Sequence, residues 1–541
     1  MTDDPKTHIT RRQALIAGAG AAGLLAIGGY ELLKPGGDGA LAGSTFAGAS
    51  GPADLTLHAK EGSVELGSRA VKTWSYDGAL PGREIRVKQG ERVRVRVVND
   101  LPQDTSIHWH GIRLHNSMDG VPVATQKPIG PGESFLYDFV APDAGTYMYH
   151  PHVGVQLDRG LYGPLIVEAR NETLAYDHEA TLMLDDWLDG VTGTPENQFR
   201  KLQRSGMTMS GSGGMGTGGM HMGGGSSGSG TGMNGGSGMG SGSAASKLGG
   251  SIAGRFTMLD GMHGRVSELS GLANGMASGM MDVGDVRYPY YVVNGRTAQA
   301  PFVVGGKGGS MLRLRLANIA SDTVFAVFVD GRPLTIVAAD GQLIDPVNSD
   351  GVVMGMGERY DVLVRMGTSP SRIVAVPLGK RGRAVALLRP DGSTAKAPPA
   401  SAPVTLPRRI AGYGDMRSVA ASQSGKPDVE HQLDLGFKMP YTWTLGGTTA
   451  AKGEDIRVAR GQHVRFRMRN YTMMPHPMHL HGHSFRPVLD GGAGPLKDTV
   501  LVAPYPEVAI DFLADNPGRW MFHCHNAYHA EAGMMRTIVV A

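Results

Sequence analysis

The stretch GERVRVRVVN, residues 90–99, decides the fold class, because charged and apolar residues alternate along it from Arg92 to Val97. A period of two is typical of a half-buried strand with a wet outer face. The pattern G-x-x-[V/L]-R-x-R-x-x-N returns at residues 309–318 and 461–470. Three copies predict three related β domains, since a chance likeness of strand and turn would not keep this spacing three times.

The domain organisation follows from these repeats. Long helical periodicity is hard to find, so we expect an all-β protein of three Greek-key sandwich or barrel domains. The length of 541 residues agrees with three domains of roughly 100–200 residues each. The predicted domains span 43–190, 286–400 and 429–541. Residues 200–285 form a predicted flexible insert, and residues 401–428, rich in Pro, Ala and Ser, a predicted linker.

Charge and cysteine content exclude several classes of protein. The net charge of +3 arises from 52 basic and 49 acidic residues spread along the chain, so no basic face indicates a nucleic-acid partner. The single cysteine, Cys524, excludes an intramolecular disulfide framework. We therefore expect burial of apolar surface to stabilise the chain, and we expect a monomer.

The first 42 residues resemble a twin-arginine export signal. Arg11 and Arg12 precede an Ala/Gly/Leu-rich stretch that runs to about Tyr30, and Ala40-Leu41-Ala42 has the small residues of a cleavage site. A membrane anchor is the alternative, but the stretch is short and rich in glycine against the roughly 20 apolar residues of a span. We predict export to the periplasm, the cell envelope or the medium, without a stable membrane span in the mature chain.

The predicted insert has an unusual composition. Residues 206–250 contain 20 glycines and many serines, which predicts disorder, because little apolar surface offsets the ordering entropy. Residues 206–281 also contain twelve methionines, which Gly/Ser linkers normally lack. Thioethers are soft ligands that favour Cu(I), so the insert is a candidate for recruiting that ion. The alternative is a low-complexity linker with accidental, oxidisable methionines.

Eight of the 19 histidines fall in four H-x-H pairs. Residues i and i+2 of a strand share a face, so each pair resembles a bidentate clamp. HWHG at 108–111 matches HLHG at 479–482, and DAGTYMYHPH at 143–152 matches NPGRWMFHCH at 516–525. The second predicted domain has no histidine, so we expect one site between the first and third domains. Eight imidazoles suit about three coppers, whereas a structural zinc takes four ligands.

Cys524 stands between His523 and His525, where the first domain has Pro151. Alternation sends its side chain to the face opposite the two histidines, so we expect it to belong to a different site inside the third domain. Further candidate ligands lie near it or upstream: His476, His529 and Met534. One thiolate, two imidazoles and a thioether form the ligand set of a mononuclear blue-copper centre. The alternative is an inert buried thiol.

These motifs resemble those of the multicopper oxidases, close to the bacterial copper-tolerance branch of laccase-like enzymes, over essentially the whole mature chain outside the insert. The resemblance implies three cupredoxin domains and four copper ions per chain. It implies a type 1 copper held by His476, Cys524, His529 and Met534. It also implies a type 2 copper held by His108 and His479, and a type 3 pair held by His110, His150, His152, His481, His523 and His525.

The resemblance further implies a reaction in which a reductant gives single electrons to the type 1 copper and dioxygen becomes water. Cys524 would conduct these electrons through covalent bonds to its two histidine neighbours. The reduction also consumes protons. Asp119 in SMDGVP matches the acid that the family places beside the type 2 copper, although Asp-Gly is also a common turn pair. Many relatives carry a second acid where this chain has Ala530, which Glu531 follows.

With dioxygen as the acceptor, the reductant stays open. Cuprous ion, oxidised to Cu(II) in a detoxifying reaction, is the expected substrate because of the methionine-rich insert. A laccase acting on phenols or aromatic amines is the alternative and would need a roomy cavity near His476 or His529. A non-catalytic copper-binding or storage protein is a hypothesis of another class, against which the complete ligand set counts.

Overall fold

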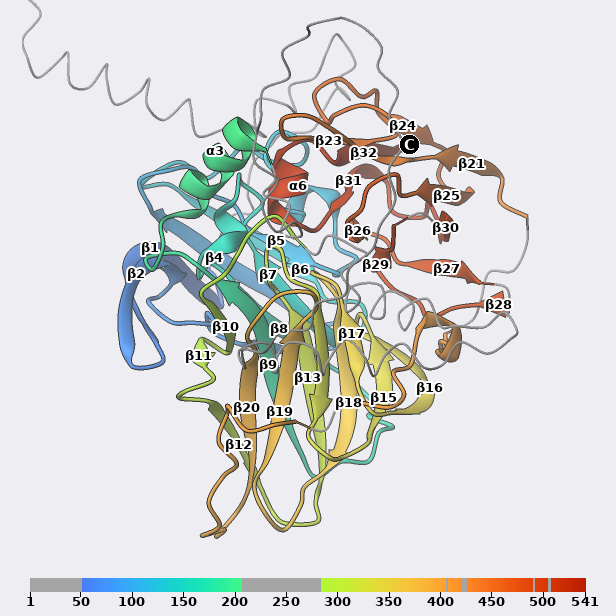
Figure 1. Cartoon of the computed structure of the whole chain (residues 1–541). Helices are drawn as coiled ribbons and strands as arrows, with labels where there is room; N and C mark the ends of the chain where they lie inside the picture. Colours follow the sequence, from blue (N-terminus) through green and yellow to red (C-terminus); the bar gives the residue numbers. More distant parts are fainter. Residues whose placement is uncertain (1–50, 207–283, 405–406, 421–425, 490–491, 505–506) are drawn as a thin grey trace, which may run out of the picture.

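The computed structural model describes residues 51–206, 284–404, 407–420, 426–489, 492–504 and 507–541. The predicted export signal and nearly all of the methionine-rich insert lie outside these residues. The regular secondary structure of the described part is nearly all strand, which confirms the all-β prediction, and it forms three two-sheet domains (Figure 1). Its helical segments are η2 (Asn116–Met118), η3 (Gln156–Asp158), α3 (Pro195–Ser205), η4 (Tyr413–Asp415) and α6 (Ala527–Glu531).

The first domain packs two four-stranded sheets, with the strand orders β2-β1-β4-β6 and β3-β8-β7-β5. Its strands are β1 (Leu55–Leu66), β2 (Arg69–Tyr76), β3 (Ile85–Lys88), β4 (Arg92–Asp100), β5 (His108–His110), β6 (Ser134–Val140), β7 (Gly145–His150) and β8 (Gly163–Glu168). Two of the four histidine pairs therefore begin or end strands of the second sheet.

The second domain packs a seven-stranded sheet, β11-β10-β9-β13-β18-β15-β16, on a five-stranded sheet, β12-β20-β19-β14-β17. Its strands are β9 (His178–Trp187), β10 (Tyr290–Val293), β11 (Arg296–Thr297), β12 (Phe302–Gly306), β13 (Met311–Asn318), β14 (Phe325–Val329), β15 (Leu334–Ala339), β16 (Gln342–Ser349), β17 (Val352–Met354), β18 (Arg359–Arg365), β19 (Ser371–Pro377) and β20 (Ala384–Pro390).

The third domain packs the sheets β21-β25-β30-β27-β28 and β24-β32-β31-β26-β29, with the hairpin β22-β23 beside them. Its strands are β21 (Val429–Gln432), β22 (Leu435–Lys438), β23 (Thr442–Leu445), β24 (Ile456–Val458), β25 (His463–Arg469), β26 (His476–Leu480), β27 (Phe485–Leu489), β28 (Gly492–Ala493), β29 (Thr499–Val502), β30 (Glu507–Leu513), β31 (Gly518–Cys524) and β32 (Met535–Val540).

The three sequence repeats form the strands β4, β13 and β25, which occupy the same place in the three domains. Each pairs parallel with one neighbour and antiparallel with the other, in the orders β1-β4-β6, β9-β13-β18 and β21-β25-β30. The glycines that open the repeats, Gly90, Gly309 and Gly461, have φ angles of 81°, 86° and 87°. Glycine is favoured there because a side chain strains this left-handed backbone.

The asparagine that ends each repeat is buried and ties two loops to its strand. The Asn99 side-chain amide donates to the carbonyl oxygens of Gln103 and Ile129 at 2.8 and 2.7 Å. Asn318 and Asn470 make the equivalent pairs of bonds at 2.7 to 3.2 Å. Buried carbonyl oxygens need such partners, so the repeat encodes a local hydrogen-bond device as well as a strand.

The second repeat differs from the expected pattern on its polar face. β4 and β25 alternate buried and partly exposed residues, whereas every residue of β13 after Met311 is buried. Arg313 pairs with Glu172 of the first domain at 2.7 Å, and Arg315 pairs with Glu179 at 2.7 Å. The predicted wet face is therefore wrong for this copy, because the face lies against neighbouring chain segments that supply acidic partners.

Two predicted boundaries also differ from the structure. Strand β9 lies inside the predicted first domain but pairs parallel with β13 and antiparallel with β10 in the sheet of the second domain. Parallel pairing between distant segments leaves no local sequence signal. Residues 200–205, predicted as the start of the insert, form the second half of α3, which Thr194 caps by accepting a hydrogen bond from the backbone N–H of Asn197.

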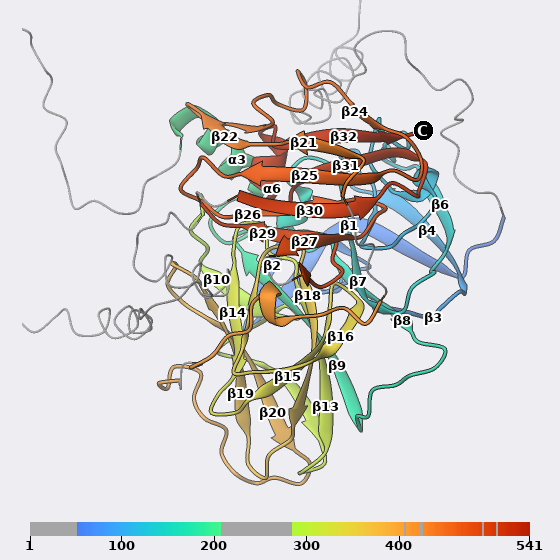
Figure 2. The same cartoon turned by 90° about the vertical axis from the view of Figure 1, so that its right-hand side faces the viewer.

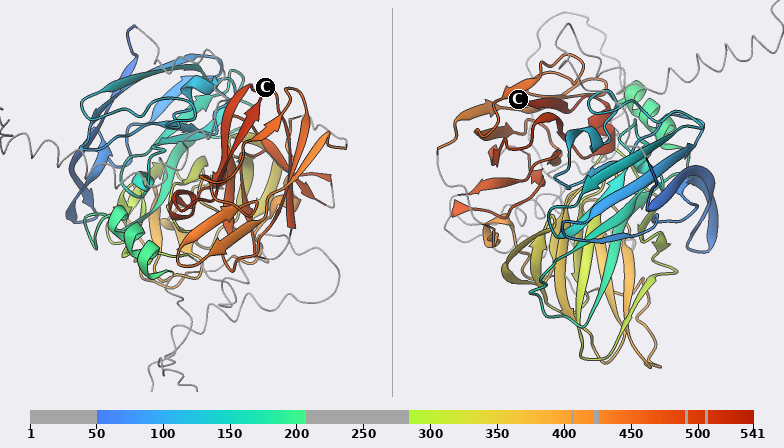
Figure 3. Two further views of the ribbon diagram at one scale, coloured as in Figure 1. Left: turned by 90° about the horizontal axis from the view of Figure 1, so that it is seen from above. Right: turned by 180° about the vertical axis from the view of Figure 1, so that it is seen from behind.

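The first and third domains lie side by side at one end of the second domain (Figure 2). The view from above in Figure 3 shows the blue first domain beside the orange and red third domain, with the second domain beneath both. The helices α3 and α6 lie close together, and the Phe199 and Tyr528 rings meet with centroids 6.3 Å apart. Among the described helices, none has the length and apolar character that crossing a membrane requires.

Candidate metal centre

The four histidine pairs meet at the junction of the first and third domains. In the first domain His108 on β5 lies opposite His150 on β7, and in the third domain His479 on β26 lies opposite His523 on β31. The two halves thus use the same strand register. All eight imidazoles are buried or nearly buried, at the place where the duplicated motifs predicted a shared site.

The two halves of the cluster face each other about an approximate twofold axis. The ring of His108 stacks on that of His481 with centroids 3.7 Å apart, and His110 stacks on His479 at the same distance. Each stack therefore joins one domain to the other. The internal duplication of the sequence thereby becomes a symmetric arrangement of imidazoles.

The closest ring nitrogens fall into groups that cut across the H-x-H pairs. His110 Nδ1 lies 3.4 Å from His150 Nε2 and 3.1 Å from His525 Nε2. A second group is formed by His152, His481 and His523. The remaining rings, His108 and His479, group with His110. These groups separate the members of three of the four pairs, so for those three pairs the geometry favours neighbouring positions rather than a clamp on one ion, whereas His108 and His110 share a group.

Backbone carbonyl groups fix which nitrogen carries the proton in several of the rings. His108 Nδ1 lies 2.8 Å from the carbonyl oxygen of Asp119, and His479 Nδ1 lies 2.9 Å from that of Asp498. His523 Nδ1 lies 2.8 Å from the Cys524 carbonyl oxygen. A carbonyl oxygen only accepts, so each Nδ1 donates, and in a neutral ring Nε2 keeps a free lone pair that faces the cluster.

The same reasoning leaves several lone pairs facing one another. His481 Nδ1 donates to the Asp119 carboxylate at 2.9 Å, so His481 Nε2 and His523 Nε2, 3.0 Å apart, are both unprotonated when these rings are neutral. The Nε2 atoms of three rings have no hydrogen-bond partner among the described residues: His108, His152 and His479. Such an arrangement is unfavourable unless a cation lies between the lone pairs.

The cluster therefore fits a metal by its donor set. Burial lowers the pKa of His110, His150 and His152 well below the ordinary histidine value, and lowers that of His523 to about 3. Neutral imidazole is the form that binds copper. Two nitrogens that share an ion at about 2.0 Å lie roughly 3.3 Å apart at a tetrahedral angle, close to the spacings between these rings.

Cys524 points away from the cluster, into the core of the third domain. Its Sγ lies 3.6 Å from His476 Nδ1 and 3.7 Å from His529 Nδ1, and these two nitrogens are 3.1 Å apart. Backbone hydrogen bonds place Met534 beside both, since its carbonyl oxygen accepts from Cys524 and its N–H donates to His529. Burial raises the pKa of the Cys524 thiol, so a cation is needed to displace its proton.

Sequence reasoning missed the groups that cover this second centre. The outer nitrogen of His529, Nε2, lies 3.1 Å from the carboxylate of Asp285, which also accepts from the hydroxyl of Tyr441. The ring of Trp443 stacks on His529 with centroids 3.9 Å apart. His476 Nε2 lies 2.8 Å from the hydroxyl oxygen of Thr472. No motif marked Asp285, because it follows the insert far from the other residues in the sequence.

Two aspartates stand in matching places at the eight-histidine cluster. The Asp119 carbonyl oxygen accepts from His108 of its own domain, while its carboxylate contacts His481 of the other. Asp498 repeats this arrangement, with its carbonyl oxygen at His479 and its carboxylate 3.2 Å from His110 Nε2. Only Asp119 was predicted from the sequence. Different loop lengths before the two acids hid the correspondence.

A cleft reaches the cluster from the side of α6. Its lining includes His150, His152, His523, His525, Met535 and Glu531. Ala530 also lines the cleft, at the position where an acid was sought. The next residue, Glu531, lines the same opening.

Comparisons with known proteins identify the family. Three multicopper oxidase profiles match residues 58–172, 179–389 and 424–541. The chain belongs to the multicopper oxidase family, which implies copper cofactors and an oxidoreductase activity.

The chain is 35% identical over 484 residues to the multicopper oxidase MmcO of Mycobacterium tuberculosis, covering 88% of this chain and 85% of that protein. It is 26% identical over 596 residues to the copper resistance protein A of Escherichia coli, covering 90% and 92%. Among solved structures, the multi-copper oxidase of Pseudomonas thermotolerans is similar, with a TM-score of 0.61, 27% identity and coverage of 91% of this chain and all of that one. These similarities confirm the predicted family and cupredoxin fold.

Proposed function

We propose that this chain is a cuprous oxidase, which oxidises Cu(I) to Cu(II) and passes the electrons to dioxygen. Four cuprous ions, four protons and one dioxygen then give four cupric ions and two waters. The observation that carries the proposal is the contact of Asp285 with His529. The buried negative charge of this carboxylate, beside the ring nitrogen that faces away from the copper position, favours a cationic over a neutral reductant, and Asp285 directly follows the methionine-rich insert.

The described ends of the insert meet at this centre. A Cβ placed on Gly206, where α3 ends, would lie 3.0 Å from the Pro440 carbonyl oxygen and 3.5 Å from Cε of Met439. Met439 is 75% exposed, which leaves its thioether open to a soft cation. At the other end, Asp285 accepts from Tyr441. Both ends of the insert thus lie beside residues 439–441, which supports a role for its methionines in supplying Cu(I).

The proposed copper ligands follow the groups of facing nitrogens. His476, Cys524, His529 and Met534 would hold the type 1 copper. His108 and His479 would hold the type 2 copper, and the type 3 pair would be held by His110, His150, His152, His481, His523 and His525. Bound copper supplies the reversible one-electron chemistry that side chains lack. Cys524 is joined through its own backbone to His523 and His525, so a short covalent path links the two centres.

Two carboxyl groups are placed to handle the protons. Asp119 lies inside the eight-histidine cluster, and its Oδ1 has no hydrogen-bond partner among the described residues. Glu531 lines the cleft that leads from outside to the same cluster. We assign proton delivery to these two acids, one at the reaction site and one at its entrance.

A laccase acting on phenols or aromatic amines is the alternative. Such a substrate must reach the edge of a type 1 imidazole, but His476 and His529 are both fully buried and their outer nitrogens already contact Thr472 and Asp285. Trp443 covers one face of His529 as well. A copper-storage protein is the remaining hypothesis. Storage alone does not require a thiolate, that of Cys524, joined through the backbone to two ligands of the eight-histidine cluster.

The location of the protein belongs to the same proposal. The twin-arginine pattern at Arg11 and Arg12 supports export in a folded state to the periplasm, the cell envelope or the medium. Oxidation of Cu(I) there would lower the amount of the ion that enters the cytoplasm.

Oxygen uptake with Cu(I) and with a phenol, in a protein of measured copper content, tests these functions together. We expect about four coppers per chain and faster uptake with Cu(I). Faster uptake with the phenol would favour a laccase, and fewer coppers without uptake would favour storage.

Two variants test the route of the reductant. Deletion of residues 206–281 removes the insert, and replacement of its twelve methionines by leucine keeps its length but removes the thioethers. Both should raise the Cu(I) concentration needed for half-maximal uptake while leaving the maximal rate nearly unchanged. Unchanged Cu(I) oxidation after the deletion would show that the insert does not supply copper.

A further inference from the structure

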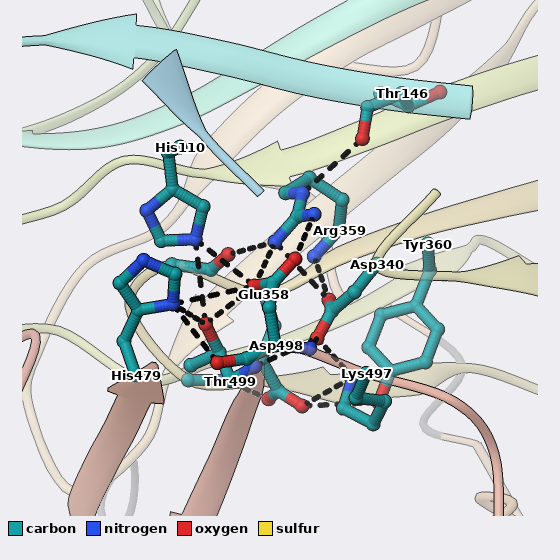
Figure 4. A network of polar contacts seen from close by, with 12 residues as sticks. His110, Thr146, Asp340, Glu358, Arg359, Tyr360, His479, Lys497, Asp498 and Thr499 are labelled. Atoms are coloured by element: carbon teal, nitrogen blue, oxygen red, sulfur yellow. Dashed lines mark hydrogen bonds and ion pairs between the residues drawn. The ribbon is translucent and has the colours of Figure 1, made fainter. Parts of the chain in front are cut away.

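A buried network of charges joins all three domains beside the eight-histidine cluster (Figure 4). Its members come from the second domain and from the segment before β29 in the third domain. The charged members are Asp340, Glu358, Arg359, Lys497 and Asp498. Every one is at most 2% exposed, although charged groups are rarely buried without a specific reason.

Arg359 of the second domain contacts both other domains at once. Its Nη1 and Nη2 atoms donate to the two carboxylate oxygens of Asp498 in the third domain at 2.7 and 2.6 Å. Its Nε donates at 3.2 Å to the carbonyl oxygen of Thr146 on β7, the first-domain strand that ends at His150. One planar guanidinium thereby holds a strand of one half of the cluster against an acid of the other half.

Asp498, which Arg359 holds in place, in turn contacts two imidazoles of the cluster. Its carboxylate lies 3.2 Å from His110 Nε2, and its carbonyl oxygen lies 2.9 Å from His479 Nδ1. Thr499 adds its hydroxyl at 3.3 and 3.1 Å from the same two nitrogens. His110 and His479 are the rings that stack on each other across the domain boundary.

Lys497 keeps the remaining acids of the network paired. Its ammonium group lies 3.0 Å from Asp340 and 3.0 Å from Glu358. Glu358 also accepts from the hydroxyl of Tyr413, at 2.7 Å. With these acids satisfied, the bidentate contact of Arg359 is directed to Asp498 alone.

The second domain also touches the rings directly. A Cβ on Gly357 would lie 3.0 Å from the ring of His525 and 3.1 Å from that of His110, so the loop 355–358 forms a wall of the cluster. Gly111, after His110, has a φ of 86° and is packed so closely that a Cβ would lie 2.4 Å from Arg359 Nη2. The second domain thus fits closely around a site to which its described residues give no histidine ligand.

Of the two matching acids, Asp119 and Asp498, only one is held by an arginine in the described part of the chain. Asp119 and Asp498 hold equivalent positions, but Arg359 pairs with Asp498 and not with Asp119, whose ion-pair partners among the described residues are the rings of His108 and His481. One acid is therefore anchored, whereas the other keeps an oxygen without a hydrogen-bond partner in the described structure. The acid held by a guanidinium suits positioning, and the acid that contacts only imidazoles suits proton transfer.

We propose that Arg359 is a positioning residue of the cluster, which acts through Asp498 and the Thr146 carbonyl group to fix the first-domain and third-domain halves against each other. The second domain would then be the part that sets the geometry of the type 2 position. This inference rests on the proposed binding of copper by the eight histidines and does not depend on the reductant.

Arg359→Lys tests the proposal in the full-length, copper-loaded protein, with Arg313→Lys as the matched control. Lysine keeps the charge but loses the bidentate geometry. Arg313 is also a buried second-domain arginine that pairs with Asp361 at 2.6 Å and with Glu172 of the first domain, and neither partner is a histidine of the cluster. Copper content, the electron paramagnetic resonance signal of type 2 copper, the blue absorption and heat unfolding are measured for both.

For Arg359→Lys we expect roughly ten- to hundredfold weaker binding of the type 2 copper, measured with a competing chelator, and an altered or lost type 2 signal. The blue absorption should stay, because the type 1 group lies apart from Arg359. Arg313→Lys should keep the type 2 signal and the blue absorption, even if it lowers the unfolding temperature as much as Arg359→Lys does. Equal type 2 signals and equal chelator resistance in the two variants would overturn the proposal.

A second variant and the wild-type protein complete the test. If Arg359→Lys does not fold, the double variant Arg359→Met with Asp498→Asn leaves no unpaired buried charge. It should keep the blue absorption and lose the type 2 signal, and an unchanged signal would overturn the proposal. A wild-type protein that binds copper without any type 2 signal would instead refute the proposed ligation, and this inference with it.

Discussion

Cys524 and Pro151 occupy the same position in the two copies of a duplicated motif, and this one difference separates the two domains chemically. Both residues are flanked by histidines of the shared cluster. Only Cys524 brings a sulfur to a second group of ligands, His476 and His529. A single side chain therefore makes the third domain the expected entry point for electrons.

Replacement of Cys524 by serine should abolish the blue absorption and turnover, because a hydroxyl is a poor substitute for the thiolate. The eight-histidine cluster should still bind copper, since none of its rings contacts Sγ. Copper analysis together with visible absorption spectroscopy checks this prediction. Loss of all copper from a folded Cys524→Ser protein would contradict the separation of the two centres.

Glu531 shows how a residue can be identified by its surroundings when its sequence position is ambiguous. The expected acid position is Ala530, and only the cleft reveals that the next side chain lies at the opening to the cluster. Glu531→Gln should slow turnover at least about tenfold, because a general acid contributes more than that in many enzymes. Anaerobic reduction of the blue centre by Cu(I) should keep its rate.

Glu531→Asp is the control, since it keeps a carboxyl group and should retain part of the activity. The solvent isotope effect on turnover should grow in Glu531→Gln if proton entry becomes limiting. An unchanged turnover in that variant would assign proton entry to another group.

At the scale of elements, the repeat illustrates what a local pattern encodes. The strand, its opening glycine and its closing asparagine were all visible in the sequence at residues 309–318, and the structure gives each a physical role. The burial of Arg313 and Arg315 was not visible, because it depends on acids more than a hundred residues away in the sequence. Periodicity indicates a strand, whereas the burial of each face of that strand depends on the chain segments that pack against it.

Asn318→Ala tests the closing asparagine of the second repeat. The change leaves the buried carbonyl groups of Thr323 and Met354 without their partner, and an unsatisfied buried group costs about 1–3 kcal/mol. We expect a loss of this size in the free energy of unfolding of the second domain, measured by urea. Asn197→Ala, at an exposed position on α3, should change it by less than about 0.5 kcal/mol.

At the scale of the whole molecule, the duplicated histidine motifs predicted a site between the first and third domains, and the family resemblance predicted the fold. What remained hidden was everything that long-range packing assembles: the strand β9 in the second domain, Asp285 at His529, and Asp498 opposite Asp119. None of these residues stands in a recurring motif. They meet the site only because three domains pack around it, so their role could be inferred only from the structure.

The burial of so many imidazoles makes the stability of the copper-free protein depend on pH. Burial lowers the pKa of eight of the proposed ligand histidines in the folded chain, whereas the unfolded chain titrates near 6.5. Below about pH 6.5 the unfolded state therefore binds more protons than the folded state, and the free energy of unfolding falls as the pH falls.

Each such histidine should contribute up to about 1.4 kcal/mol per pH unit below 6.5, down to its folded pKa, which is about 3 for His523. Urea unfolding of the copper-free protein at pH 7.5 and 5.5 should show a loss of several kcal/mol. Replacing His110 and His150 by glutamine should remove about two such contributions and flatten the dependence, because glutamine does not titrate. A stability that stays constant between the two pH values would mean that these imidazoles are open to water or already protonated in the folded chain, and would contradict the lone-pair arrangement from which the metal site was inferred.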